Sequence, residues 1–172
     1  LLEDAVSKLA GTKNPFLGES ELMLGLALCM TGRKELAVSE LKNRIDSVDA
    51  SESYRLSRLI AGLVFIYQLS GEIFAARPAA RQLLLLSKSR RMDLAKAWSY
   101  YFLGVIDLQA GELKNASRNF EHAVEMRYVL EPRASIDAMI GLALALQLTG
   151  MEESADETYR RLESFALEMN PR

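Results

Sequence analysis

The sequence is poor in the residues that form disulfides, metal sites and nucleophile–base pairs. Its 172 residues include one cysteine, Cys29, and one histidine, His122. A single cysteine excludes an internal disulfide, and its place in an apolar, helix-like stretch favours a buried thiol over a nucleophile. His122 has no second histidine or cysteine at the spacing of metal ligands. The sequence therefore predicts no metal site.

Other signals of catalysis are missing as well. No run matches the Gly-x-x-x-x-Gly-Lys-Ser/Thr loop that cradles phosphates, or the Gly-x-Ser-x-Gly turn that exposes a nucleophilic serine. Aspartate and glutamate are abundant, but no pair stands in an apolar surround of the kind that tunes an acid and a base. We therefore expect no catalytic residue, no bound cofactor and no enzymatic activity.

An excess of one charge and a long apolar run are also absent. The chain has 21 Lys and Arg against 23 Asp and Glu, and a formal net charge of −2. A nucleic-acid surface needs clustered cations, whereas the densest cluster, Lys88, Arg90 and Arg91, fits the solvated end of a helix. The longest apolar run, residues 83–86, is far shorter than the roughly 20 residues that span a membrane. We expect neither direct nucleic-acid binding nor a membrane partner.

Proline and glycine are scarce, with 4 and 10 residues, and 49% of the chain is hydrophobic. No stretch shows the alternation of a β strand, so this composition predicts a folded, all-helical chain with a sizeable core. The first residue is Leu1, and no signal-peptide pattern follows it. We expect the chain to be a fragment of a longer protein.

A repeat of about 40 residues is the most specific feature of the sequence. Glycines recur 39, 40 and 39 residues apart, at Gly32, Gly71, Gly111 and Gly150. An alanine follows each glycine by five residues, at Ala37, Ala76, Ala116 and Ala155, and a leucine precedes each by eight, at Leu24, Leu63, Leu103 and Leu142. Apolar residues on both sides of each glycine recur at helical intervals of three or four. Each repeat is therefore predicted to be a helical hairpin that turns at its glycine.

The small residues of the repeat predict close packing. In the third hairpin we expect Gly104 and Ala116 to face each other across the turn at Gly111-Glu112. A hairpin cannot bury both of its faces alone, so neighbouring hairpins must stack on one another. Small, aromatic and small residues in this order resemble the tetratricopeptide repeat (TPR). The resemblance implies an all-α, right-handed TPR-like α-solenoid, in which the first helices of the hairpins line the concave surface.

We expect one domain over residues 1–172. Its repeats are predicted at about 16–50, 51–91, 92–131 and 132–169, after residues 1–10, which end a preceding repeat, and a loop at 11–15. Arg44 stands where the other hairpins carry an apolar residue, so we interpret it as a weakened, end-like position. Pro78 predicts a kink or a delayed start in its helix. Asp107 occupies a position that is more often aromatic in TPR units.

Several runs resemble the helical-repeat region of the MalT-like, LuxR-type large ATP-binding transcriptional regulators. They are RLSRLIAGLVFIYQLSGE (55–72), AKAWSYYFLGVIDLQAGEL (95–113), FEHAVEMRY (120–128) and IGLALALQLTGMEESADETYRRLESFALE (140–168). The resemblance covers residues 54 to the end and implies a cytoplasmic sensor and signal-coupling segment. Its partner would be a small-molecule inducer or a protein or peptide in the concave groove. DNA and ATP would be bound only by modules outside this fragment.

Projection of the TPR geometry onto the sequence gives a candidate groove. Its predicted binding residues are Arg58, Phe65, Gln68, Trp98, Tyr101, Asp137 and Gln147, and the same projection places Ala61, Ile140 and Leu144 on this surface. Trp98 and Tyr101 could stack on a sugar or a peptide side chain, and the polar groups could fix its orientation. The alternative is that these two rings pack between adjacent repeats as core.

Two further alternatives concern the loops and the function. Arg127 and Tyr128 are expected to order the loop between repeats, although they could contribute to binding. A generic TPR scaffold for protein–protein interaction, attached to another signalling module, is the alternative to the regulator interpretation.

Overall fold

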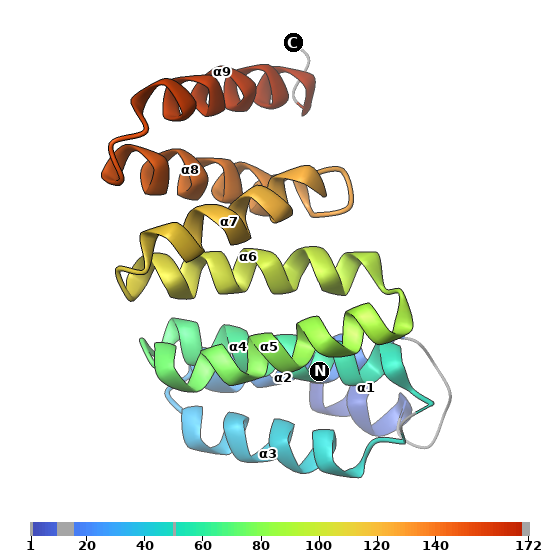
Figure 1. Cartoon of the computed structure of the whole chain (residues 1–172). Coiled ribbons are helices and arrows are strands. Elements are labelled where there is room, and N and C mark those ends of the chain that lie inside the picture. Colours follow the sequence, from blue (N-terminus) through green and yellow to red (C-terminus); the bar gives the residue numbers. More distant parts are fainter. Residues whose placement is uncertain (1, 10–15, 50, 170–172) are drawn as a thin grey trace. The chain divides into compact units, whose positions relative to one another are not determined.

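The computed structural model describes residues 2–9, 16–49 and 51–169, and every regular element in these ranges is a helix (Figure 1). The helices are α1 (Leu2–Leu9), α2 (Leu17–Met30), α3 (Lys34–Ser47), α4 (Ser53–Leu69), α5 (Ile73–Arg90), α6 (Asp93–Gln109), α7 (Leu113–Glu125), α8 (Pro132–Leu148) and α9 (Glu152–Met169). The all-α prediction is confirmed. The loop expected at 11–15 lies outside the described residues.

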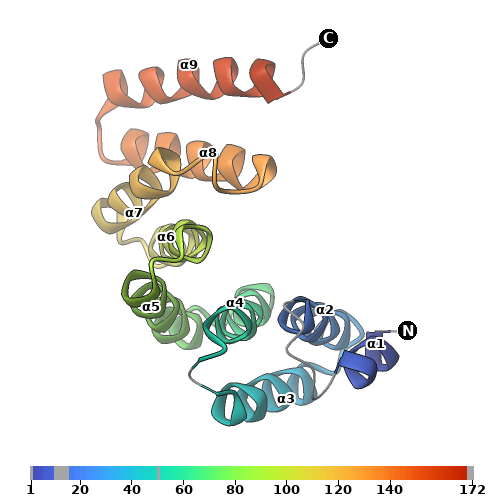
Figure 2. The same ribbon diagram turned by 90° about the vertical axis from the view of Figure 1, so that its right-hand side faces the viewer.

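The helices form four hairpins, α2–α3, α4–α5, α6–α7 and α8–α9. They belong to two compact units, Leu1–Arg91 and Met92–Arg172. In the first unit α4 packs on α2, α3 and α5, while α1 packs on α2. In the second unit α8 packs on α6, α7 and α9 (Figure 2). The first helix of α4–α5 and that of α8–α9 therefore each contact both helices of the preceding hairpin in their unit, and this is the stacking that the repeat predicts.

The four repeat glycines end their helices in the same way. All have a left-handed backbone, with φ of 79° at Gly32, 70° at Gly71, 74° at Gly111 and 76° at Gly150. At the third turn the Gly111 N–H donates to the Leu108 carbonyl and the Glu112 N–H to the Asp107 carbonyl. The other three turns repeat this pair of hydrogen bonds. It satisfies carbonyl groups that a helix end leaves unpaired, which confirms the predicted role of the glycines.

Arg91 ends α5 in the same left-handed region without being a glycine. Its φ is 53°, the only positive φ of a non-glycine residue in the described ranges, and its side chain is exposed. A side chain with a Cβ carries a steric cost there that glycine avoids. We predict that Arg91→Gly raises the free energy of unfolding by about 0.5–1 kcal/mol in urea denaturation. An unchanged or lowered stability would contradict this interpretation of the cap.

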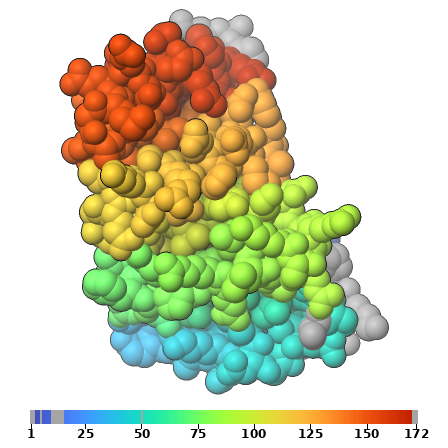
Figure 3. All heavy atoms as spheres, in the orientation of Figure 1, coloured from blue at the N-terminus to red at the C-terminus, as the bar shows by residue number. Residues whose placement is uncertain are grey.

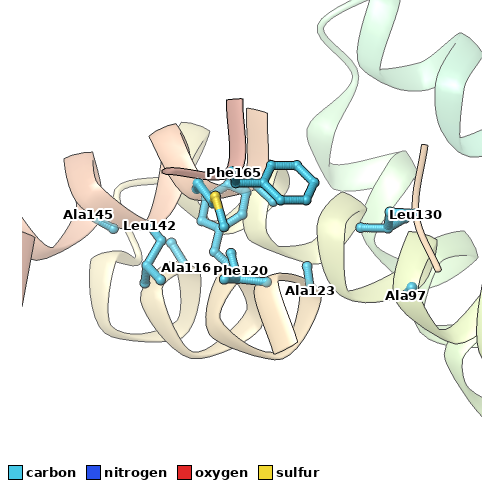
Figure 4. Packing of buried hydrophobic residues seen from close by; sticks show 11 residues of the cluster. Ala97, Ala116, Phe120, Ala123, Leu130, Leu142, Ala145 and Phe165 are labelled. Carbon is cyan, nitrogen blue, oxygen red and sulfur yellow. The ribbon is translucent and has the colours of Figure 1, made fainter. Parts of the chain in front are cut away.

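The repeated alanines lie where a helix approaches its neighbour closely. Ala37, Ala76 and Ala116 are fully buried and Ala155 is nearly so. Gly104 differs from its prediction, because the nearest side chain to it is Phe120 and not Ala116. Gly141 of α8 meets the same Phe120 ring, so this ring fills notches in two first helices. Figure 4 shows Phe120 in the buried cluster of the second unit, and Figure 3 shows side chains filling the gap between the ribbons of α7 and α8.

The interpretation of Arg44 as a weakened, end-like position is wrong. Its guanidinium donates to the Glu21 carboxylate of α2 at 2.7 Å. Arg55 of α4 holds the same carboxylate, with bonds of 2.9 Å and 2.7 Å from Nε and from a terminal nitrogen. The Glu21 side chain has no exposed surface, whereas those of Arg44 and Arg55 are 28% and 22% exposed. One buried carboxylate thus joins the first hairpin to the second.

Pro78 is the sixth residue of α5, and the helix begins at Ile73, so the alternative of a delayed start is wrong. A proline there removes one helical hydrogen bond. The carbonyl left without that partner belongs to Phe74, four residues earlier, and Phe74 is 87% exposed. Because water can solvate this turn, the helix accommodates the proline.

Asp107 also has a structural reason. It is nearly buried, and its carboxylate accepts a hydrogen bond of 2.8 Å from the Asn119 side chain of α7. The polar residue in an aromatic position therefore ties the two helices of its own hairpin together.

Candidate functional site

The candidate site in the second unit lies on the first helices α6 and α8, which contact each other. Trp98 and Tyr101 of α6 are both half-buried. Their rings meet edge-on with 5.5 Å between centroids, and the Trp98 ring lies 5.4 Å from that of the fully buried Phe102. The two rings are thus anchored against the core and keep part of their surface exposed. The core alternative accounts for the anchored part only.

The facing helix α8 supplies the polar and aliphatic groups. Asp137 and Gln147 are exposed, and between them Ile140 and Leu144 leave 45% and 39% of their surface accessible. These four residues recur at helical spacing, so they share one side of α8. Burial raises the pKa of the Tyr101 phenol above its usual value of 10.0, and the Asp137 carboxylate raises it further. The structure therefore brings Tyr101 and Asp137 together.

The raised pKa of Tyr101 predicts a measurable effect of pH on stability. The phenol of the unfolded chain ionises near pH 10, while the folded chain still holds its proton, so stability falls as the pH rises above about 10. The Arg133 guanidinium lowers the pKa and reduces this effect. We expect Tyr101→Phe to lose less stability than the wild type between about pH 9 and pH 11 in urea denaturation.

Tyr159→Phe is the matched control, because Tyr159 of α9 is 42% exposed and we expect the variant to follow the wild type. Parallel curves for Tyr101→Phe and the wild type would contradict the placement of Tyr101 in a desolvated, acidic surround.

In the first unit the predicted residues Arg58, Phe65 and Gln68 lie on α4, and all three are half-buried. Arg58 is engaged by its surroundings, since its Nε lies 3.1 Å from a carboxylate oxygen of Glu19 on α2. Its guanidinium also stacks on the Tyr54 ring, 5.1 Å from the centroid. Glu19 precedes its helix-ending glycine by the same 13 residues as Arg58, so this ion pair joins equivalent positions of two first helices. Arg58 is therefore less accessible to a ligand than the projection predicted.

The sequence reasoning missed the buried carboxylate of Glu21. The only signal was Arg44, a cation in an otherwise apolar column, which required a buried counter-charge. Repeat spacing did indicate Ile140 and Leu144, because they occupy the positions in the fourth repeat that Tyr101 and Val105 occupy in the third. It could not indicate how much of their surface stays exposed.

The reactive residues singled out in the sequence have ordinary surroundings. The half-buried Cys29 has its sulfur 4.0 Å from the Ser70 hydroxyl. His122 packs on the Tyr100 ring and lies 3.3 Å from the Glu125 carboxylate. Across the described ranges, no three His, Cys, Asp or Glu side chains are grouped so that they could hold a metal ion. Among the helices placed by the structure, none has the length and apolar character to cross a membrane.

Arg127 and Tyr128 order the turn between α7 and α8, as predicted. The Ser135 hydroxyl of α8 donates to the Arg127 carbonyl at 2.7 Å. The Arg127 guanidinium stacks on the Tyr128 ring at 4.5 Å, and the Tyr128 hydroxyl donates to Glu168 of α9 at 3.1 Å. The turn is thereby fixed to both helices of the fourth hairpin.

Comparison with known protein families finds no match, and neither does comparison with curated protein sequences. Two solved structures are similar, both of the nearly identical TPR-like repeats of a putative kinesin light chain from Podosopora anserina. The first, a variant, has a TM-score of 0.69 at 19% sequence identity, over 98% of this chain and 84% of that one. The second has a TM-score of 0.65 at 18% identity, over 99% and 86%. The chain therefore has a TPR-like helical-repeat fold.

Proposed function

We propose that this chain is a non-catalytic binding module that docks a segment of a protein partner on its first-helix face. In the second unit this face consists of Trp98 and Tyr101 of α6 with Asp137, Ile140 and Leu144 of α8. The observation that carries the proposal is the exposure of these apolar side chains on two adjacent helices, next to a carboxylate. Ile140 and Leu144 leave 45% and 39% of their surface accessible. Burial of such groups favours association, and anchored aromatic rings lose little conformational freedom.

The fold supports the same proposal. Stacked helical repeats form extended binding surfaces because each repeat contributes equivalent positions to one face. Asp137 has no ion pair among the described residues, so its carboxylate is available to a cation of the partner. An extended or helical peptide with apolar side chains and a lysine or arginine fits this surface best.

Selection from a random peptide library tests the proposal and does not require the partner to be identified. Peptides that bind the wild-type chain should bind an Ile140→Glu/Leu144→Glu variant at least about tenfold more weakly, because the two carboxylates remove the apolar contact. Leu167→Glu is the matched control, since Leu167 lies on α9 in the same unit and is 63% exposed. Selected peptides that bind all three proteins equally would refute the proposed face.

The resemblance to LuxR-type regulators supplies a finer, second proposal. In it the module is the cytoplasmic sensor segment of such a regulator, and Trp98 and Tyr101 stack on a sugar-like inducer. The favouring observation is the pair of rings that meet edge-on with part of their surface exposed. The similar solved structures add nothing to it. Calorimetric titration with a panel of sugars would remove this version if no heat of binding were found, and would leave the peptide proposal in place.

A further inference from the structure

A cavity of about 340 Å³ lies elsewhere in the second unit, between the turn after α7 and helix α9. Its lining residues are Arg127, Tyr128, Met139, Glu157, Arg160, Arg161, Ser164, Phe165 and Glu168. None of them belongs to the first-helix face. The volume is within the range of small-molecule sites.

The floor of the cavity is apolar and rigid. Met139 and Phe165 are almost completely buried, with 1% and 3% of their surface exposed. The Tyr128 ring packs edge-on against the Phe165 ring at 5.8 Å, and Tyr128 is itself held by Glu168. An apolar group placed here would contact side chains that are already fixed by the fold.

The charged groups of the rim leave two guanidinium groups available. Glu157 pairs with Arg160 at 2.8 Å. Arg161 has no carboxylate partner among the described residues. Within the same ranges, Arg127 donates to the Val124 carbonyl and the Tyr128 hydroxyl, although a guanidinium carries five N–H donors. Three arginines against two glutamates leave one surplus positive charge, which suits a monoanion better than a dianion.

We propose that this cavity binds a carboxylate carried on an apolar group, with the carboxylate at Arg127 and Arg161 and the apolar group on Met139 and Phe165. The planar fork of arginine matches a carboxylate with two parallel hydrogen bonds. The same chemistry occurs in a small organic acid and in the C-terminus of a polypeptide with an apolar last residue. The site does not depend on the proposed peptide-binding face.

Calorimetric titration of the whole chain tests the site with two matched pairs of probes. The first pair is phenylacetate and the neutral phenylacetamide, and the second is a short peptide ending in phenylalanine with a free or an amidated C-terminus. We expect at least one acid to bind about tenfold more tightly than its amide. Binding of phenylacetate alone assigns the site to small acids, and binding of the free-acid peptide alone assigns it to polypeptide ends.

Arg161→Gln should weaken binding of the acid about tenfold and leave binding of the amide unchanged. Its side chain is exposed, so we expect the variant to fold, which circular dichroism checks. Arg118→Gln is the control, because Arg118 is an arginine of α7 outside the cavity. The proposal is overturned if neither acid binds at about 10 mM, if acid and amide bind equally, or if Arg161→Gln binds the acid as the wild type does.

Discussion

Gly141→Ala is expected to lower the free energy of unfolding by about 2–3 kcal/mol, although alanine is the better helix former. A Cβ at this position would lie 2.4 Å from the Phe120 ring, far inside van der Waals contact. The ring cannot retreat towards α6, because a Cβ at Gly104 would also lie only 2.6 Å from it. Phe120 is 1% exposed and fills both notches, so the added methyl group must separate the helices. Urea denaturation measures the loss.

A second substitution distinguishes this clash from a general effect of the glycine. We expect Phe120→Leu to cost stability alone but to recover most of the loss when combined with Gly141→Ala, because the smaller side chain makes room for the methyl group. Gly62→Ala is the control, since its Cβ would meet nothing closer than 3.3 Å. Additive losses for Gly141→Ala and Phe120→Leu would show that the ring does not couple the two helices.

The buried carboxylate of Glu21 gives the second large effect. We expect the double variant Arg44→Leu/Arg55→Leu to lose about 3–5 kcal/mol, because it leaves a carboxylate without exposed surface and without its partners. Glu21→Leu should cost clearly less, since the arginine side chains are 28% and 22% exposed and can turn their charge towards water. Denaturation curves in urea compare these variants.

The triple variant with leucine at all three positions should be more stable than Arg44→Leu/Arg55→Leu, because no buried charge remains. Arg160→Leu is the control, as its ion pair with Glu157 is exposed and should contribute less than about 1 kcal/mol. If Glu21→Leu were as damaging as the double variant, the stated asymmetry between buried anion and accessible cations would be wrong.

The parts of the fold that could be predicted from the sequence are those that depend on local spacing. Gly111 and its three equivalents indicate helix ends, because a positive φ favours glycine wherever it occurs. The fully buried Ala116 indicates a close approach for a similar reason. By contrast, the Glu21–Arg55 contact joins residues 34 positions apart, and neither residue has a counterpart in the other repeats that would reveal it.

The candidate site could be predicted in position more than in accessibility. Helical spacing places Tyr101 and Asp137 on neighbouring first helices, and in the structure the Asp137 carboxylate is near enough to raise the pKa of Tyr101. Spacing could not tell that Arg58 is engaged by Glu19, because that contact depends on how two helices align along their axes. Nor could it find the cavity at Arg161, since its lining combines a turn with two helices.

Fluorescence of Trp98 tests the central claim most directly, because Trp98 is the only tryptophan of the chain and lies on the proposed binding face. We predict that a peptide selected on the wild-type protein shifts the Trp98 emission during titration, with the affinity found by calorimetry. In the Ile140→Glu/Leu144→Glu variant the shift should require at least about tenfold more peptide. Tight binding of the peptide with no change in Trp98 emission would contradict the assignment of the first-helix face as the docking surface.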